Sequence, residues 1–288
     1  MSASPLLHRF KHDAMATSFE IVISAHDADQ LYAGQAAHAL FAEIDRLEDE
    51  LSRFRAGSDI FHLSQLKAGD SANVGLATWD CLTLAKSVYE ETDRAFDITI
   101  GPLMGLWRTL GGDPRQPPAD ELAYAHTIVG SHLFTLDEDG LEVTVHASPM
   151  VFDLGAIGKG YALDMCADLL REWSISNALL NAGDSTVLAL GNESTGSTGW
   201  SVTIGPDDNK QTLQLQDLAV SGSGFAVQGA HIMNPRTLEP VTIKPQRSYA
   251  IAPSAAMSDA LSTAFMVMEE EEIAKFCDRI GQIQALSL

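Results

Sequence analysis

The chain has 288 residues, 45% of them hydrophobic, so it can bury a sizeable core and is not a disordered protein. It carries 18 Lys and Arg against 39 Asp and Glu, a formal net charge of −21 at pH 7, which argues against nucleic acids and anionic membranes as partners. Its three scattered cysteines, with no CxxC pair, exclude a disulfide framework and disfavour structural zinc.

The N-terminal half is predicted to begin with a strand over residues 16–25, rich in β-branched and aromatic side chains. Asp27 and Asp29 are candidate caps of the helix that follows. That helix has one apolar face with helical spacing, formed by Leu40, Ile44, Leu47 and Leu51. A second helix is predicted over about 78–91.

The rest of the chain is richer in strands. A Pro/Gly loop at 111–120 is followed by a hairpin with its turn at 137–140, and then by a short strand at 151–154 that enters a glycine turn and a helix. Further strands are predicted at 178–181, 186–190, 200–204, 212–219, 248–252 and the C-terminal IQALSL, and helices at about 258–268 and 270–280. Because many strands follow one another without a helix between them, the pattern predicts an α+β fold with largely antiparallel sheets flanked by helices. We expect one domain over 1–288, with 111–120 as the candidate internal boundary.

The sequence offers no membrane anchor. No segment reaches the roughly 20 apolar residues of a membrane span, and the N-terminus has neither a signal-peptide pattern nor a lipid-attachment cysteine. We therefore expect no stable membrane insertion and a cytoplasmic protein. A leader removed by processing would instead place it in the periplasm or anchor it to a membrane.

The first segment that could bind a ligand or take part in catalysis is D-L-G-A-I-G-K-G, from Asp153 to Gly160. A strand, a glycine turn, Lys159 and a helix start together offer backbone N–H groups and a positive charge to a phosphate. The spacing differs from both a Walker A loop and GxGxxG. A tight turn with a solvated lysine explains the same residues equally well.

The second segment is M-S-D-A-L-S-T-A-F, in which Asp259 and Thr263 share one helix face at i, i+4. A carboxylate and a hydroxyl are hard ligands that suit Mg²⁺ or Ca²⁺. The structural alternative, which is favoured for this segment alone, is a capping Asp with a Thr bonded to the helix backbone.

Two further positions stand out in the sequence. His231, in G-A-H-I-M-N-P-R-T, is a candidate general base, although a lone histidine is more often structural or exposed. Asp97 lies between Phe96 and Ile98, so its carboxylate is either exposed or bonded to something specific. Thr99 and Pro102 suit a strand that ends in a turn.

Taken in order, several segments closely resemble the ApbE family, the FAD:protein FMN transferases. The segments are M-A-T-S-F near the start, S-R-F-R-A-G-S-D-I (52–60), A-F-D-I-T-I-G-P-L (95–103), D-L-G-A-I-G-K-G-Y-A-L-D (153–164), L-N-A-G-D-S (180–185), S-G-S-G-F with H-I-M-N-P-R-T (221–237), and S-D-A-L-S-T-A-F (258–265). The resemblance covers about residues 10–288.

The resemblance implies an FAD-binding α+β fold and Mg²⁺-dependent cleavage of the FAD pyrophosphate, with FMN attached through a phosphoester to a threonine of an acceptor protein. It assigns the metal to the side chains of Asp259 and Thr263 and the backbone carbonyl of Ala156. It assigns FAD contacts to Met15, Phe54, Ala95, Phe96, Asp97, Asp153, Lys159, Ile232 and Met233. His231, by its place in the H-I-x-[D/N]-P motif, is the candidate base for the acceptor hydroxyl.

The departures from the family pattern lie on the acceptor side of the site. The common S-G-D-Y is replaced by Ser221–Gly222–Ser223–Gly224–Phe225, Asn234 replaces an Asp, and the usual Pro-x-Thr-Gly ends in Leu238. The resemblance therefore supports FAD and metal binding more strongly than transfer. Two other functions remain open, a Mg²⁺-dependent FAD pyrophosphatase that gives FMN and AMP, and a non-catalytic FAD-binding protein.

Overall fold

The main element of the computed structural model is a seven-stranded sheet with the strand order β1-β2-β6-β7-β10-β13-β14. Residues 6–107, 113–183, 185–224, 232–241 and 247–288 are described. Every pair of neighbouring strands in this sheet is antiparallel, which confirms the predicted fold class. The strands are β1 (Leu7–Ala14), β2 (Thr17–Ser24), β6 (Ala178–Ala182), β7 (Thr186–Leu190), β10 (Leu218–Gly224), β13 (Arg247–Ala252) and β14 (Gln284–Ser287).

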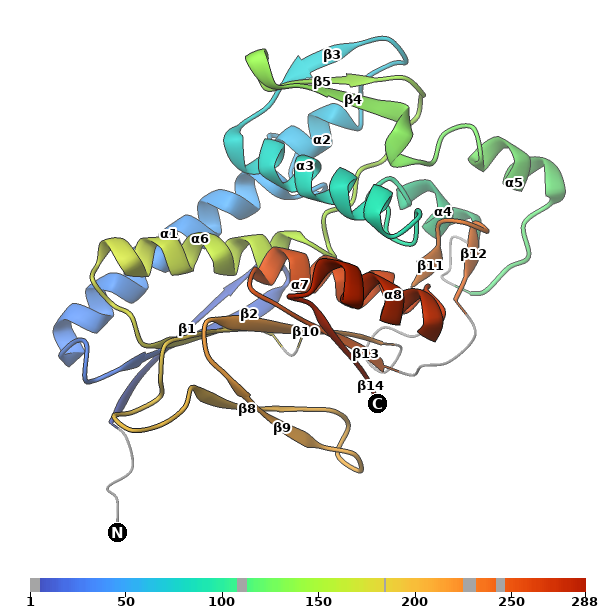
Figure 1. The fold of residues 1–288 in the computed structure, drawn as a ribbon. Helices are drawn as coiled ribbons and strands as arrows, with labels where there is room; N and C mark the ends of the chain where they lie inside the picture. The colour runs from blue at the N-terminus through green and yellow to red at the C-terminus, as the bar shows by residue number, and fades with distance from the viewer. Residues whose placement is uncertain (1–5, 108–112, 184, 225–231, 242–246) are drawn as a thin grey trace.

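Helices cover one face of this sheet (Figure 1). They are α1 (Gln30–Leu51), α6 (Gly158–Glu172) and α7 (Ala255–Ala264), and α8 (Glu270–Ile280) lies beside β14. The opposite face packs against a hairpin of β8 (Trp200–Ile204) and β9 (Gln211–Leu215). Alternation along β2 explains both layers, because Phe19 and Ile21 are buried under the helices while Val22 joins the cluster under the hairpin.

A smaller sheet, in the order β3-β5-β4, lies above the helical layer in Figure 1. Its strands are β3 (Ser71–Asn73), β4 (Phe134–Asp137) and β5 (Glu142–Val145). Around it lie α2 (Asp59–Leu63), α3 (Leu76–Glu91), α4 (Gly101–Leu106), α5 (Ala119–Ala125) and the 3₁₀ turns η1 (Ser131–Leu133) and η2 (Glu138–Gly140). Helix α3 connects the two parts, since it contacts both α1 and α7. A last short hairpin, β11 (Met233–Asn234) with β12 (Glu239–Pro240), lies near α4 and α8.

Several predicted elements are confirmed in detail. Asp29 is the N-cap of α1 and its carboxylate accepts from the backbone N–H of Tyr32 at 2.9 Å, and the four predicted apolar residues of that helix are buried. The hairpin with its turn at 137–140 is β4–η2–β5, and α8 has the predicted bounds.

Three expectations were wrong, and one strand was missed. Residues 151–154 form no strand, because the N–H of Phe152 donates to the Ser64 hydroxyl and that of Asp153 to the Ile98 carbonyl. The predicted strand 212–219 is two strands of different sheets, separated at Asp217, whose φ is 53°. Thr99 lies in a turn that leads into α4 rather than in a strand. Strand β1 was not predicted, because its charged outward residues hide the alternation.

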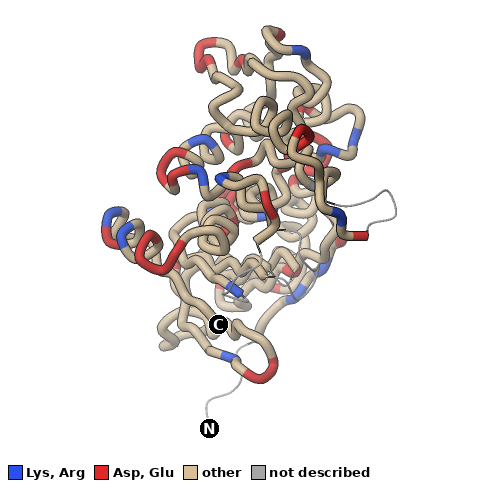
Figure 2. The backbone as a smooth tube through the Cα atoms, turned by 90° about the vertical axis from the view of Figure 1, so that its right-hand side faces the viewer, with Lys and Arg blue, Asp and Glu red and all other residues tan. Residues whose placement is uncertain are grey.

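Part of the acidic charge is paired with basic side chains, although the 39 Asp and Glu outnumber the 18 Lys and Arg. In Figure 2, Lys and Arg lie beside Asp and Glu at several places along the chain. Arg46, for example, pairs with Glu43 and Glu50 on α1 at 2.6 Å. Among the helices of the described residues, none is long and apolar enough to cross a membrane.

Candidate functional site

Several candidate functional residues lie at one end of the seven-stranded sheet. The register places the start of β2, the end of β6, the start of β7 and Ser221 of β10 side by side there. Gly183, just after β6, packs so closely on Thr17 that a Cβ at position 183 would lie 2.2 Å from its hydroxyl. Helix α7 passes over this end of the sheet and reaches β10 with its last turns.

Asp259 is the buried carboxylate of this site. It lies on α7 with 4% of its surface exposed. Its Oδ2 accepts from the backbone N–H of Gly160 at 3.2 Å, and its Oδ1 from the Thr186 hydroxyl at 3.3 Å, which in turn accepts from Ser221 at 3.2 Å. The capping interpretation is wrong, since Ser254 is the N-cap of α7 and Asp259 instead binds an N–H in the first turn of α6.

Lys159 brings a positive charge to the same place. Its Nζ donates to the Gly155 carbonyl at 2.5 Å and lies 3.7 Å from Oδ2 of Asp259. Its side chain is 21% exposed, so it is partly buried rather than fully solvated. With the first turn of α6 beside it, this corner of an acidic protein concentrates a lysine, backbone N–H groups and the positive end of a helix.

Small residues allow α6 and α7 to approach closely. A Cβ at Gly160 would lie 2.2 Å from the carbonyl oxygen of Ala255. One turn further along α6, Asp164 accepts hydrogen bonds from the backbone N–H groups of Ala255 and Ala256 and from the Ser254 hydroxyl. Asp164 thus satisfies the free N–H groups at the start of α7 and fixes the crossing of the two helices.

Thr263 lies one turn after Asp259 on α7. Its hydroxyl oxygen is 2.9 Å from the Ser223 hydroxyl, so it bonds across to β10 rather than to its own helix backbone. Ala156 lies in the turn before α6, which the bonds from the N–H groups of Ile157 and Gly158 to Leu154 close.

The resulting donor set is made of hard oxygens. It contains the Asp259 carboxylate, hydroxyls and the backbone carbonyls of the turn, while the described residues hold no cluster of three or more His, Cys, Asp or Glu. Such a set fits Mg²⁺ or Ca²⁺ and does not fit a soft metal.

Asp153 and Phe54 are connected through Arg53. The Arg53 guanidinium lies 4.5 Å from the centre of the Phe54 ring, and its Nε is 3.4 Å from Oδ2 of Asp153. Asp153 also accepts a hydrogen bond from the N–H of Gly155, the residue whose carbonyl accepts from the Nζ of Lys159. Phe54 is 80% exposed, so its ring, apart from the side covered by Arg53, is open to a flat ligand.

Segment 95–97 lies next to this group, because the N–H of Asp153 donates to the carbonyl of Ile98. The side chains of Ala95, Phe96 and Asp97 are buried. Burial raises the pKa of Asp97, and hydrogen bonds from the N–H and hydroxyl groups of Thr99 and Ser131 oppose that rise. Asp97 therefore accepts its hydrogen bonds from two other turns of the same chain, at Thr99 and at Ser131.

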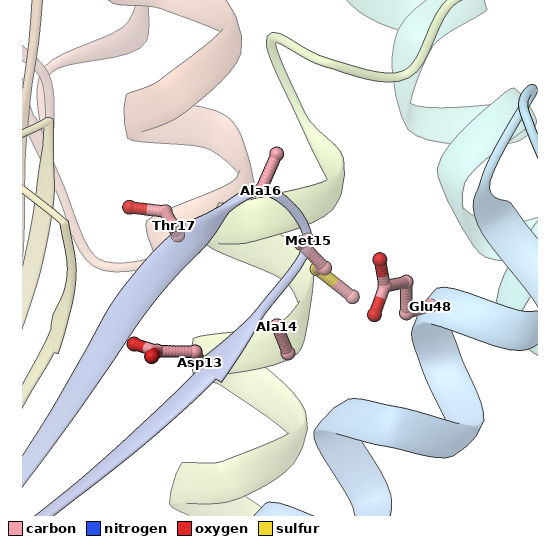
Figure 3. A pocket seen from close by; sticks show the side chains of 6 residues that line it. All are labelled: Asp13, Ala14, Met15, Ala16, Thr17 and Glu48. Atoms are coloured by element: carbon pink, nitrogen blue, oxygen red, sulfur yellow. The ribbon is translucent and has the colours of Figure 1, made fainter.

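Met15 lies in the turn between β1 and β2, at the edge of an open pocket of about 450 Å³ (Figure 3). Its side chain points towards Glu48 of α1, and both Met15 and Ala16 have positive φ angles, 50° and 57°. This turn is at the same end of the sheet as Asp259, since β2 pairs with β6 and β6 with β7.

The remaining predicted residues belong to the segment before and within β11. Ile232 and Met233 are buried, and His231 lies outside the described residues. The structure thus brings Asp259 and Lys159 together, with Thr263 one turn further along α7 and Asp153 bonded into the turn before α6. Segment 95–97 adjoins Asp153, and Met15 lies at the same end of the sheet, whereas no described hydrogen bond joins Ile232 or Met233 to Asp259 or Lys159.

Sequence reasoning missed the groups that orient Asp259, Thr263 and Asp153. These are Thr186, Ser221, Ser223 and Arg53, together with the N–H of Gly160. Three of them lie on strands whose place beside α7 depends on the sheet order, which no local pattern indicates. Arg53 could have been found, because it directly precedes the motif residue Phe54.

Comparison with known proteins supports one family. The model of the ApbE family matches residues 15–287. A relative from Klebsiella pneumoniae (strain 342), named FAD:protein FMN transferase, is 27% identical over 272 residues, covering 87% of this chain and 76% of the relative. A relative of the same name from Escherichia coli (strain K12) is 25% identical over 289 residues, covering 93% and 80%.

Solved structures agree with this fold. The apo form of the Pseudomonas stutzeri flavinyl transferase ApbE superposes with a TM-score of 0.83 at 24% identity, over 98% of this chain and 90% of the other. The ApbE protein of Thermotoga maritima superposes with a TM-score of 0.82 at 25% identity, over 98% and 94%. The chain belongs to the ApbE family.

Proposed function

We propose that this protein transfers FMN from FAD to a threonine hydroxyl of an acceptor protein and releases AMP, with Mg²⁺ as cofactor. The observation that carries the proposal is the corner formed by Asp259, Lys159 and the first turn of α6. The names of the relatives, FAD:protein FMN transferase, support the same reaction.

The corner suits a pyrophosphate because it places positive charge next to the negative phosphates, in a protein whose net charge is −21. The Nζ of Lys159 and the positive end of α6 can attract phosphate oxygens, and their fixed positions avoid reorganisation during the reaction. The exposed ring of Phe54, near the same turn, can stack on a flat ring of FAD.

Asp259, Thr263 and the carbonyl of Ala156 would hold the Mg²⁺. When bound, the ion supplies positive charge to the phosphate oxygens and to the departing AMP. The bonds from Gly160 and Thr186 fix the orientation of the Asp259 carboxylate.

In the transfer, the acceptor threonine oxygen bonds to the phosphorus of the FMN half, the bond from that phosphorus to the bridging oxygen breaks, and AMP leaves with that oxygen. The hydroxyl proton passes to a base, for which His231 remains our prediction. Asn234 does not disturb this segment, because its Oδ1 accepts from the N–H of Arg236 as an aspartate would.

The alternative is hydrolysis of FAD to FMN and AMP, which the altered S-G-S-G-F segment at 221–225 favours. The two reactions differ in the fate of FMN. The protein should be incubated with FAD, with and without Mg²⁺, and with an acceptor domain that carries a flavinylation sequence. We expect the acceptor to gain the mass of one FMN only when Mg²⁺ is present. AMP and free FMN with an unmodified acceptor would support the hydrolase, and intact FAD would leave only a binding protein.

A further inference from the structure

Arg236 joins three parts of the chain that are far apart in sequence. Its Nε donates to the carbonyl of Asp93 and one terminal nitrogen to that of Thr92, both at 2.8 Å. Its other terminal nitrogen donates to both carboxylate oxygens of Glu272, at 3.0 and 3.1 Å. One planar guanidinium therefore connects the β11–β12 hairpin, the end of α3 and the start of α8.

The end of α3 needs such support. Asp93 and Arg94 are consecutive residues with positive φ, 49° and 66°, although neither is glycine. Non-glycine residues keep this conformation only where the surroundings impose it. The carbonyls of Thr92 and Asp93 lie at the C-terminal, negative end of α3, where a cation is favourable. This turn leads directly into segment 95–97.

The β11–β12 hairpin is held from the other side as well. The N–H of Arg236 donates to the side chain of Asn234, and the indole N–H of Trp107 donates to the carbonyl of Leu238 at 2.8 Å. The hairpin carries Met233, and Ile232 comes immediately before it. Arg236 thus lies between two segments that we expect to line the FAD site, 95–97 and 232–233.

We infer that Arg236 is a positioning residue that sets the spacing of these two segments and thereby the affinity for FAD, an inference that rests on the proposed function. Glu272 assists by holding one end of the guanidinium while its Oε2 also accepts from the N–H of Glu269 at the start of α8. A lysine could not replace Arg236, because a single ammonium group cannot reproduce the fixed fork that contacts two carbonyls and a carboxylate together.

Arg279 offers a matched control. It lies on α8 and also binds the end of α3, through the carbonyl of Glu91 at 2.9 Å and the Glu91 carboxylate. It makes no described bond to the β11–β12 hairpin. Loss of Arg279 thus removes a comparable tie between α3 and α8 but leaves the hairpin anchored.

The test compares the wild-type protein with Arg236→Ala, Arg236→Lys and Arg279→Ala, by urea unfolding, by fluorescence titration with FAD in the presence of Mg²⁺, and by visible circular dichroism of the bound flavin. We expect both alanine variants to unfold at lower urea. Only the two Arg236 variants should bind FAD more weakly, by about tenfold, and change the flavin dichroism at saturation. If Arg236→Ala does not fold, the FAD affinity and flavin dichroism of Arg236→Lys test the inference.

Two outcomes would overturn the inference alone. One is wild-type FAD affinity in the Arg236 variants, and the other is equal weakening in Arg236→Ala and Arg279→Ala, which would make the contact merely structural. A wild-type protein that binds no FAD would overturn the proposed function first, and the inference with it.

Discussion

Substitution of Gly160 by alanine tests the close approach of α6 and α7. The added Cβ would lie 2.2 Å from the carbonyl oxygen of Ala255 and 2.7 Å from the Cα of Ala256. Both are backbone atoms, so no side-chain rotation relieves the overlap. To reach even the 3.0 Å limit of real Cβ contacts, the helices must separate by about 0.8 Å.

The separation has two costs. Forced repacking costs about 1–3 kcal/mol, and the bond from the Gly160 N–H to Asp259, already 3.2 Å long, is lost. The gain in helix propensity from glycine to alanine is about 1 kcal/mol. We therefore expect a net loss of about 2 kcal/mol in the free energy of unfolding. Metal binding should weaken by about tenfold, because Asp259 loses a group that orients it.

Gly158 provides the control in the same turn of α6. A Cβ there meets nothing closer than Leu154 at 3.8 Å, an ordinary contact. Gly158→Ala should leave the protein unchanged or stabilise it by up to about 1 kcal/mol. The assays are urea unfolding and calorimetric titration with Mg²⁺. Equal stability and metal affinity in the two variants would refute the packing of α6 on α7 described above.

Three other substitutions follow, two in the site and one in the core, where Cys166 of α6 is buried. Asp259→Asn should bind Mg²⁺ about 100-fold more weakly in calorimetry, and an unchanged affinity would remove Asp259 from the metal site. Phe54→Ala should weaken FAD binding about tenfold in a fluorescence titration while the urea midpoint stays the same, because the ring is exposed. Equal FAD affinity would show that the ring does not stack on FAD. Burial raises the pKa of Cys166 above its ordinary 9.0, so the folded state retains a proton that the unfolded chain releases. The free energy of unfolding should therefore fall as the pH rises above 9. In Cys166→Ala this fall should be less steep, by about 1.4 kcal/mol per pH unit. Parallel stability curves for the wild type and the variant would contradict this.

The fold was largely predictable from the sequence because most of its elements have local signals. The apolar face of α1, its cap at Asp29 and the turn at 137–140 each depend on residues a few positions apart. The apolar run at 151–154 was misleading because a buried irregular segment has the same pattern as a buried strand. Only the partners of its N–H groups, in distant loops, distinguish the two.

The sequence indicated which motif residues form the candidate site, but not the groups that orient their side chains. Asp259 and Thr263 share a helix face, which spacing alone predicts. Thr186, in contrast, is 73 positions from Asp259 in the sequence and reaches it only because β7 and β10 are neighbours in the sheet. Arg236 contacts Thr92 and Asp93, which directly follow α3 and lie more than 140 positions away, and the sequence contains no signal for this contact.

The central claim, that FMN passes from FAD to a protein hydroxyl, is tested most directly by a mass balance. FAD, AMP, free FMN and acceptor-bound flavin should be quantified together by chromatography and mass spectrometry during one incubation with Mg²⁺ and acceptor. We predict one AMP for each flavin attached to the acceptor, with little free FMN. AMP and free FMN in equal amounts, with no flavin on the acceptor, would contradict the claim.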